Sequence, residues 1–313
     1  MGTNKIYFRG LNELRAIAAI SVIFYHIHYY LPSVGLADVP FMKVGNAGVT
    51  LFFVLSGFLI TYLLLDEKET QNNVSIKNFY LRRILRIWPL YFLYIGILVI
   101  LFLTGVIKLN HNFPTLLFYI FFLGNVPMWL RIEGFPLVGH FWSLGVEEQF
   151  YAFWPWIVKK SRNVFRAIFL IWAVYFVLKI VSRSIEILNN EQDTLFHKFI
   201  NVFCFGIMAI GGMAACALYY KKNTILKIVY YPLIQILAWV IYISTAFNFI
   251  NSIIPSVILH DIFGAATAVI ILNTVSNPKP LFRIYNRALD FLGKISFGLY
   301  VYHSLVLYIR ALS

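Results

Sequence analysis

Long apolar stretches without a single charge dominate the chain. Residues 16–37, 44–65, 87–107 and 199–220 contain no Asp, Glu, Lys or Arg. A transmembrane helix needs about 20 predominantly apolar residues, and each of these stretches is long enough. The pattern predicts an all-α, polytopic membrane bundle with a central cavity between its helices, and it places candidate helices at 12–31, 47–65, 84–107, 115–131, 145–158, 164–182, 198–220, 229–250, 256–275 and 291–311.

The number of crossings depends on segment 145–158, which is short and begins with two acids and a glutamine. It is compatible with a full span, a half-span or a re-entrant piece that lines a cavity. Lys5 and Arg9 favour a cytoplasmic N-terminus, because cytoplasmic loops carry the basic residues. Placing every later basic cluster on the same side requires nine crossings, whereas counting 145–158 gives ten.

Composition agrees with this class. Apolar residues make up 60% of the chain and charged residues 12%, against about 45–50% and about 25% in soluble domains. The net charge is +13, but the basic residues flank apolar spans and form no separate basic face, which argues against nucleic-acid binding. We expect one transmembrane domain over 1–313, with no appended soluble domain, in the inner (cytoplasmic) membrane.

Polar residues inside the predicted spans are the candidates for function, because they cost free energy there. Arg15 and His26 are eleven residues apart, which puts them on one helix face but about 16 Å apart in depth. His26 is therefore a candidate proton acceptor. The alternative is a core histidine that bonds a neighbouring helix.

Three arginines, Arg82, Arg83 and Arg86, fall within an arc of about 100° of one predicted helix. Guanidinium groups on one face suit the binding of phosphate groups. The alternative is a membrane anchor whose side chains snorkel to the interface.

A later block, His140-Phe-Trp-Ser-Leu-Gly-Val-Glu-Glu-Gln-Phe-Tyr, places Glu147 and Glu148 between apolar flanks. Ser143 and Glu147 share a helix face, and a carboxylate there could orient a histidine or bind a sugar hydroxyl; the alternative is a counter-ion to an arginine. Tyr300 and His303 also share a face, where aromatic packing is the alternative to substrate binding.

Ser56 and Gly57 lie in the middle of the span predicted at 47–65. Small residues at such positions allow helices to approach closely. We interpret the pair as a packing feature, with pore lining as the alternative.

Taken together, these blocks resemble the family-3 membrane acyltransferases, which acylate bacterial surface glycans and other acceptors. The resemblance covers almost the whole chain and rests on five blocks in the same order. They are Leu14-Arg15 with His26, Val49-Thr-Leu-Phe-Phe-Val-Leu-Ser-Gly-Phe-Leu-Ile, Arg82-Arg83-Ile-Leu-Arg86-Ile-Trp-Pro-Leu-Tyr, Phe141-Trp-Ser-Leu-Gly-Val-Glu-Glu-Gln-Phe-Tyr and Ser296-Phe-Gly-Leu-Tyr-Val-Tyr-His303. Glu13 stands where the family often carries an aspartate, and the extra esterase-like domain of some members is not expected here.

The resemblance implies about ten spans and an O-acyltransferase that moves an acyl group, most simply acetyl, from cytoplasmic acyl-CoA to a carbohydrate hydroxyl, as on a cell-surface polysaccharide. It implies no metal and no permanently bound cofactor. The implied partners are membrane lipids, acyl-CoA, the carbohydrate acceptor and a partner protein for extracytoplasmic transfer. The implied site comprises His26, Arg15, Glu147 and Glu148 as catalytic residues, Arg82, Arg83 and Arg86 at the donor, and Ser143, Tyr300 and His303 at the acceptor.

Two other interpretations of the same residues remain. A transporter or carrier of a lipid-linked or small glycan also places ionisable groups in its spans, although the sequence shows no inverted repeat. A structural membrane protein without a site of its own leaves the three-arginine face and the acid pair unexplained.

Overall fold

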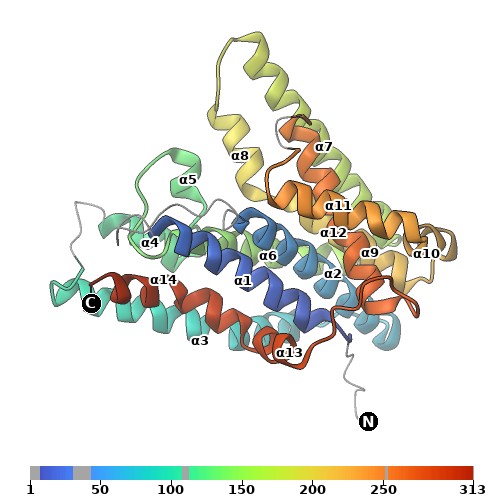
Figure 1. Ribbon diagram of the computed structural model, residues 1–313, viewed down its shortest axis with the longest axis horizontal. Helices are drawn as coiled ribbons and strands as arrows, with labels where there is room; N and C mark the ends of the chain where they lie inside the picture. The colour runs from blue at the N-terminus through green and yellow to red at the C-terminus, as the bar shows by residue number, and fades with distance from the viewer. Residues whose placement is uncertain (1–7, 31–43, 108–112, 251–252, 313) are drawn as a thin grey trace. The chain divides into compact units, whose positions relative to one another are not determined.

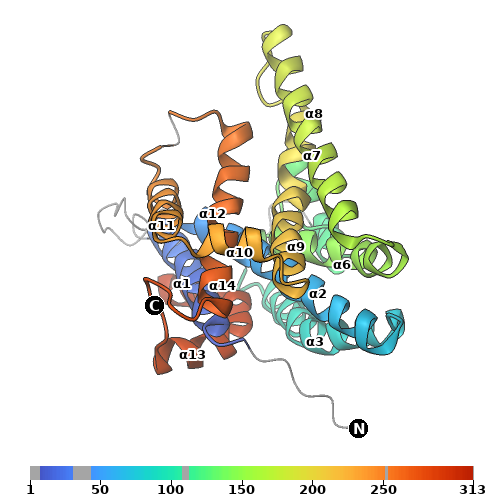
Figure 2. The same cartoon turned by 90° about the vertical axis from the view of Figure 1, so that its right-hand side faces the viewer.

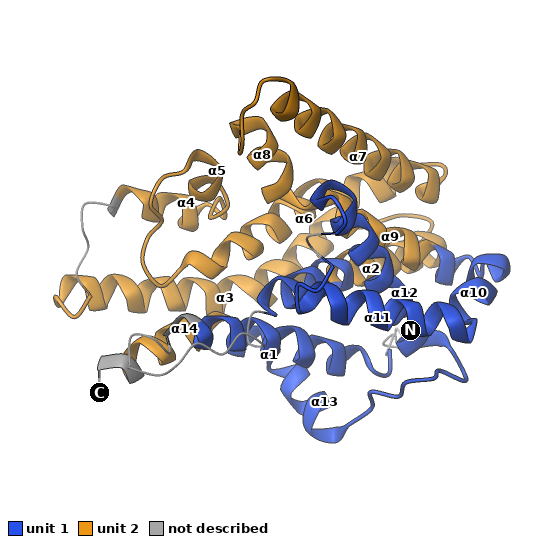
Figure 3. Ribbon diagram, turned by 45° about the horizontal axis from the view of Figure 1, so that its top comes forward, with its two compact units in different colours: residues 1–55, 217–300 blue, residues 56–216, 301–313 orange. Residues whose placement is uncertain are grey.

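The computed structural model describes residues 8–30, 44–107, 113–250 and 253–312, and within these ranges the only regular secondary structure is helical. The described chain forms two compact units, residues 1–55 with 217–300 and residues 56–216 with 301–313 (Figure 3). The boundaries fall inside three helices, α2 (Gly45–Gln71), α9 (Phe205–Tyr219) and α14 (Ser296–Leu312).

The first unit is built around the N-terminal helix α1 (Leu11–Tyr30), which packs on α12 (Ser256–Ser276) and α13 (Arg287–Lys294) (Figure 1). The Asn12 side-chain amide donates to Asp290 Oδ1 at 2.8 Å, and this bond fastens α13 to the start of α1. In the same unit α10 (Asn223–Tyr230) leads into α11 (Pro232–Ala246), which packs along α12 (Figure 2).

The second unit contains the helices from α3 to α9, together with parts of α2 and α14. Its bounds are α3 Ile76–Leu103, η3 Phe113–Thr115, α4 Leu116–Ile120, α5 Val126–Leu130, η4 Gly139–Phe141, α6 Trp142–Lys160, α7 Val164–Leu188, α8 Leu195–Phe203 and α9 Phe205–Tyr219. Figure 1 shows α8 returning beside α7. The last three residues of α9 belong to the first unit.

Aromatic side chains hold α6 in place in the second unit. Tyr91 of α3 stacks between Phe122 and Phe141, with ring centroids 4.4 and 4.6 Å away. Trp154 of α6 stacks on Phe150 at 4.2 Å, and its indole N–H donates to Thr61 Oγ1 at 2.8 Å. Stacked rings of this kind bury large apolar areas, and the buried indole N–H keeps a partner. These contacts fix the helix that carries the acid pair.

Helix length and composition support the polytopic membrane fold. Among the described residues, five helical segments are long and apolar enough to cross a membrane, and two bent pairs, α10–α11 at 68° and α13–α14 at 74°, raise the number to seven. Helices α3 and α7 also expose large apolar residues such as Leu85 and Leu170, at 67% and 61%, as lipid-facing helices do. The fold class is confirmed, whereas the count of about ten spans is not.

Two predicted helices differ from the structure because of a tertiary contact and a backbone turn. The single helix predicted at 115–131 is wrong: the chain forms α4 and α5, since the Gln149 amide binds the carbonyl oxygen of Phe122 and the side chain of Asn125 at the break. The helix predicted at 198–220 is interrupted at Cys204, whose φ is +50°.

Three further predictions concern helix ends. The doubtful segment 145–158 is one continuous helix, α6, of 19 residues and therefore about 28 Å long. The helix predicted at 229–250 breaks at Pro232, which starts α11, and the one predicted at 291–311 breaks at Ile295 between α13 and α14.

Candidate active site

The predicted site residues divide between the two units. The first unit holds Arg15, His26 and Tyr300; the second holds Arg82, Arg83, Arg86, Ser143, Glu147, Glu148 and His303. Each group is described within its own unit.

In the first unit, a backbone contact indicates the tautomer of the neutral His26 ring. Its Nδ1 lies 2.9 Å from the carbonyl oxygen of Val22, one turn earlier on α1. A carbonyl oxygen can only accept, so Nδ1 carries the proton and, in the neutral ring, Nε2 carries the lone pair. Tyr25 contacts the ring edge to face, with centroids 5.5 Å apart. This tautomer is the one that a general base needs at Nε2.

Arg15 and His26 lie on one unbroken helix, since α1 runs continuously from Leu11 to Tyr30. Both side chains are half-buried. The unbroken helix keeps the expected separation of about 16 Å, so the two groups act at different depths.

Glu13, one turn before Ile17 on α1, is a site candidate that the sequence pattern marked only as a family difference. Its side chain is 1% exposed, and neither carboxylate oxygen has a hydrogen-bond partner among the described residues. Buried polar groups are nearly always hydrogen-bonded in folded proteins. A buried carboxylate in this state is a candidate for contact with a ligand.

In the second unit, Glu147 is held by two hydroxyl groups. Ser56 Oγ of α2 donates to Glu147 Oε1 at 2.8 Å. The Tyr151 hydroxyl lies 3.3 Å from Glu147 Oε2 and 3.1 Å from Ser56 Oγ. Hydrogen bonds to a charged acceptor are among the stronger ones, so this carboxylate links α2 to α6. We refer to Ser56, Arg83, Glu147, Glu148 and Tyr151 as the acid cluster.

Glu148 has fewer contacts than its neighbour. The indole N–H of Trp88 is 3.5 Å from Glu148 Oε2, the long limit for a hydrogen bond. Within the described part of the chain, Glu148 Oε1 is buried without a partner, and so is Arg83 Nε. The two groups are close enough to interact electrostatically, and the Arg83 guanidinium also lies about 6 Å from the rings of Phe79 and Tyr151.

The three arginines of α3 have different environments. Arg82 is exposed and forms an ion pair with Glu67 Oε2 at 2.9 Å. Arg86 is also exposed, whereas Arg83 is half-buried and lies over the ring of Tyr151 in the acid cluster. Arg83 therefore connects the basic outer face of α3 to the acids of α6.

Ser143 and the late tyrosine are both buried. Ser143 is 7% exposed, and its hydroxyl donates to the carbonyl oxygen of His140 at 3.4 Å. Tyr300 is 4% exposed and packs edge to face on Phe52, with centroids 5.8 Å apart. The aromatic packing that was the alternative to substrate binding for Tyr300 is therefore present in the structure.

A buried chain of hydrogen bonds joins α14 to His140, and the sequence had indicated only one member, His303. His140 Nε2 lies 3.1 Å from the carbonyl oxygen of Val301, so Nε2 is the donor. In a neutral ring Nδ1 then accepts, and it does so from Ser304 Oγ at 3.1 Å. Ser304 has given its only proton, so His303 Nε2 at 3.3 Å donates to it.

The sequence contained one weak signal for each of the other two members: Ser304 directly follows His303, and His140 begins the block that contains Glu147 and Glu148. The sequence patterns also missed the contact between Asn125 and Gln149, whose side-chain amides donate to each other at 2.8 and 3.2 Å. No sequence pattern links those two residues.

Comparison with known proteins bears on the chemistry of this site. A family model described as an acyltransferase domain matches residues 8–310. A protein of Staphylococcus aureus (strain COL), provisionally named an O-acetyltransferase, is 27% identical over 96% of this chain and 51% of its own length. The peptidoglycan O-acetyltransferase OatA of Listeria monocytogenes is 27% identical over 96% of this chain and 49% of its own length.

A third relative, the O-acetyltransferase OatA of Staphylococcus aureus (strain NCTC 8325), is 30% identical over 57% of this chain and 30% of its own length. The chain thus spans about half the length of the curated relatives that match it along nearly its whole sequence. No solved structure matches it.

Proposed function

The chain belongs to the acyltransferase family whose domain model it matches over residues 8–310, and from this premise we propose that it is a membrane O-acyltransferase that uses acyl-CoA as donor and a carbohydrate hydroxyl as acceptor. The acetyl group is the expected acyl group, because the named relatives are O-acetyltransferases. Family membership favours an enzyme over a transporter or a purely structural protein.

The observation that carries the proposal is the tautomer of His26. With Nδ1 donating to Val22, the lone pair of Nε2 can take the proton of an acceptor hydroxyl. The hydroxyl oxygen then attacks the thioester carbonyl, the carbon–sulfur bond breaks, and the proton passes from His26 to the departing thiolate. Acyl transfer through His26 itself, as a transient acyl-imidazole, is the alternative route.

The donor requires a site for the phosphates and the polar arm of CoA. Arg86 and Arg82 present guanidinium groups on the exposed side of α3, with Arg82 shared with Glu67. The unpartnered Nε of Arg83 and Oε1 of Glu148 supply one donor and one acceptor, which suit the amide groups or the hydroxyl of an elongated substrate. Arg15, about 16 Å from His26, attracts the anionic donor and does not contact the reacting carbonyl.

Replacing His26 tests the proposal. Membranes containing His26→Gln should transfer radiolabelled acetyl from acetyl-CoA to glycan at least about a hundredfold more slowly than wild type, because general bases contribute about 10²–10⁴ in rate. The matched control is His260→Gln, since His260 is an exposed histidine of the same unit, and it should retain wild-type rates. Full activity in a folded, inserted His26→Gln variant would refute the assignment.

The acceptor is identified by a second measurement. Mass analysis of surface glycans from cells with and without the chain reports the acceptor and the acyl mass together. Peptidoglycan is the first acceptor to examine, because one relative is named for it.

A further inference from the structure

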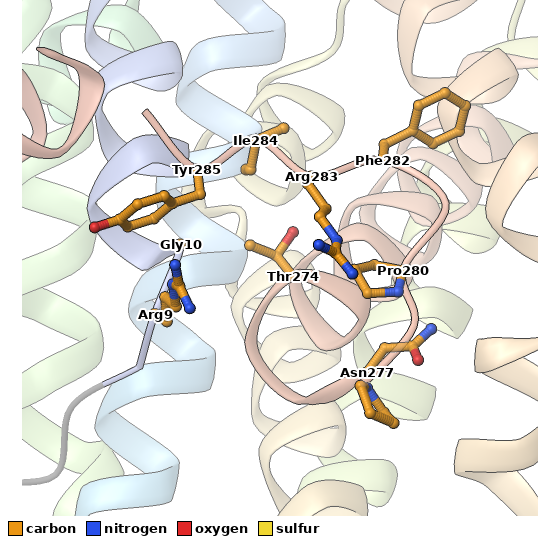
Figure 4. Close-up of a pocket in the computed structure, with 10 residues that line it drawn as sticks. Arg9, Gly10, Thr274, Asn277, Pro280, Phe282, Arg283, Ile284 and Tyr285 are labelled. Atoms are coloured by element: carbon orange, nitrogen blue, oxygen red, sulfur yellow. The ribbon is translucent and has the colours of Figure 1, made fainter. Parts of the chain in front are cut away.

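A cavity of about 430 Å³ opens in the first unit, where the start of α1 meets the segment that follows α12 (Figure 4). Two arginines line it, Arg9 from just before α1 and Arg283 from the segment after α12, and Figure 4 shows Thr274 between them. Phe282 and Tyr285 supply aromatic walls. None of the residues lining this cavity is acidic.

The charges of this cavity are not neutralised within the described part of the chain. The Arg9 guanidinium lies over the ring of Tyr285, 4.2 Å from its centroid. Neither Arg9 nor Arg283 has a carboxylate partner among the described residues. The nearby acid Asp290 is engaged by Asn12 and by Lys294, whose Nζ is 2.6 Å away. Two unneutralised guanidinium groups that converge on one cavity favour an anion with several oxygen atoms, such as a phosphate.

The surroundings indicate that the cavity lies at the depth of lipid headgroups. Helix α13 is amphipathic, with Arg287 and Lys294 beside a 61% exposed Phe291, and it bends by 74° from α14. A short amphipathic helix at such an angle to a span suits the plane of the membrane interface. Phe282 and Tyr285 are 48% and 51% exposed at the cavity rim, as residues of an interfacial aromatic belt are.

We propose that this cavity binds the phosphate headgroup of an anionic phospholipid. Arg9 and Arg283 hold the phosphate oxygens, and Phe282 and Tyr285 contact the glycerol and the upper acyl chains. Basic cavities at the cytoplasmic ends of membrane helices suit such headgroups, and the basic N-terminal sequence favours that side. The residues of this cavity belong to the first unit and those of the acid cluster to the second, and the proposal does not depend on the proposed reaction.

Lipid binding by the full chain tests this proposal. The chain is purified in neutral detergent at about 0.15 M salt, where surface attraction is screened beyond about 8 Å, and is titrated with a fluorescent phosphatidylglycerol probe. Arg283→Gln and Arg9→Gln should each weaken binding by about tenfold, the loss of one charge-assisted contact. Arg283→Lys keeps the charge but loses the two-pronged geometry, so it should also weaken binding severalfold.

The matched control is Arg287→Gln, because Arg287 is exposed on the same segment but does not line the cavity. It should change the affinity by less than about twofold, the level expected of an exposed charge at this salt concentration. Equal losses in Arg287→Gln and Arg283→Gln, or an unchanged Arg283→Lys, would mean general surface attraction and overturn the proposal. Displacement of the probe by CoA at equimolar concentration would assign the cavity to a nucleotide phosphate and overturn the lipid assignment.

Discussion

Glu147 and Glu148, the two adjacent acids of α6, should affect different properties of the protein when each is replaced by glutamine. Glu147 accepts from Ser56 at 2.8 Å and lies 3.3 Å from the Tyr151 hydroxyl, so its carboxylate holds helices together. Glu148 has one contact at the long limit and one buried oxygen without a partner among the described residues. We therefore expect Glu147→Gln to cost mainly stability and Glu148→Gln to cost mainly activity.

The magnitudes follow from these contacts. A hydrogen bond to a charged group contributes about 1.5–3 kcal/mol and a neutral one about 0.5–1.5 kcal/mol. Glu147→Gln makes one of these contacts neutral and puts an NH2 group, which cannot accept a hydrogen bond, at the other. It should lower the free energy of unfolding by about 2 kcal/mol, or the Tm by about 3 °C, since the entropy of unfolding is about 2.1 cal/mol/K per residue. Glu148→Gln removes a charge that has one long hydrogen bond and an electrostatic contact with Arg83, so it should lower the Tm less than Glu147→Gln does.

Enzymatic activity should fall more in Glu148→Gln than in Glu147→Gln, the reverse of the order expected for the Tm. If Glu148 Oε1 accepts a hydrogen bond from substrate, Glu148→Gln should lower kcat/KM by about ten- to a hundredfold. The assays are thermal unfolding in detergent and acetyl transfer from labelled acetyl-CoA. Asp193→Asn, at a 68% exposed carboxylate of the same unit, is the matched control and should change neither readout. A Glu148→Gln variant that is fully active, or as destabilised as Glu147→Gln, would refute the reasoning.

Three further predictions concern packing, the buried chain and the donor. Gly57→Ala should lower stability by about 1–3 kcal/mol in thermal unfolding, because a Cβ atom there would overlap the carbonyl oxygen of Met208, whereas Gly96→Ala, with nothing within 4 Å of its Cβ, should be neutral or stabilising. Ser304→Ala should lower stability by about 1–3 kcal/mol, because it removes the buried hydrogen bond between Ser304 Oγ and His140 Nδ1, and an unchanged Tm would contradict the contribution of that bond. Arg86→Ala should raise the KM for acetyl-CoA by about tenfold with kcat within twofold, and an unchanged KM would exclude Arg86 from the donor site.

Local patterns in the sequence predicted the features that depend on one helix. Charge-free stretches of about 20 residues predicted the helical membrane class, and the spacing of Ser143 and Glu147 predicted a shared helix face. Both residues lie on α6, although the helix predicted at 145–158 left Ser143 out. The small pair Ser56-Gly57 was interpreted as a close helix approach, and this is confirmed by the contact of Gly57 with the backbone of α9. Each inference needed only the period and rise of a helix.

Features that depend on contacts between distant segments were not predictable in this way. The break between α4 and α5 is held by Gln149 and Asn125, which lie 24 positions apart. The bond between Ser304 and His140 spans 164 positions. Hydropathy along the chain does not predict such pairings. The apolar residues around a polar group show that it lies in a helix, but not which helix it contacts. The individual roles of the predicted site residues therefore stay predictions until the variants are measured.

We expect hydrogen-bond satisfaction to separate structural from functional polar groups more sharply than burial does. His140, Ser304, Asn125 and Gln149 are buried or half-buried, yet their polar atoms bond one another, and such groups specify packing. In contrast, some polar atoms are buried without a partner among the described residues: both carboxylate oxygens of Glu13, and one atom each of Arg83, Glu148 and Thr245. Each such atom costs about 1–3 kcal/mol, a cost that a polar ligand would offset by supplying the missing bonds. By this criterion we expect Glu13, in the first unit, to contact a ligand, although the sequence pattern marked it only as a family difference.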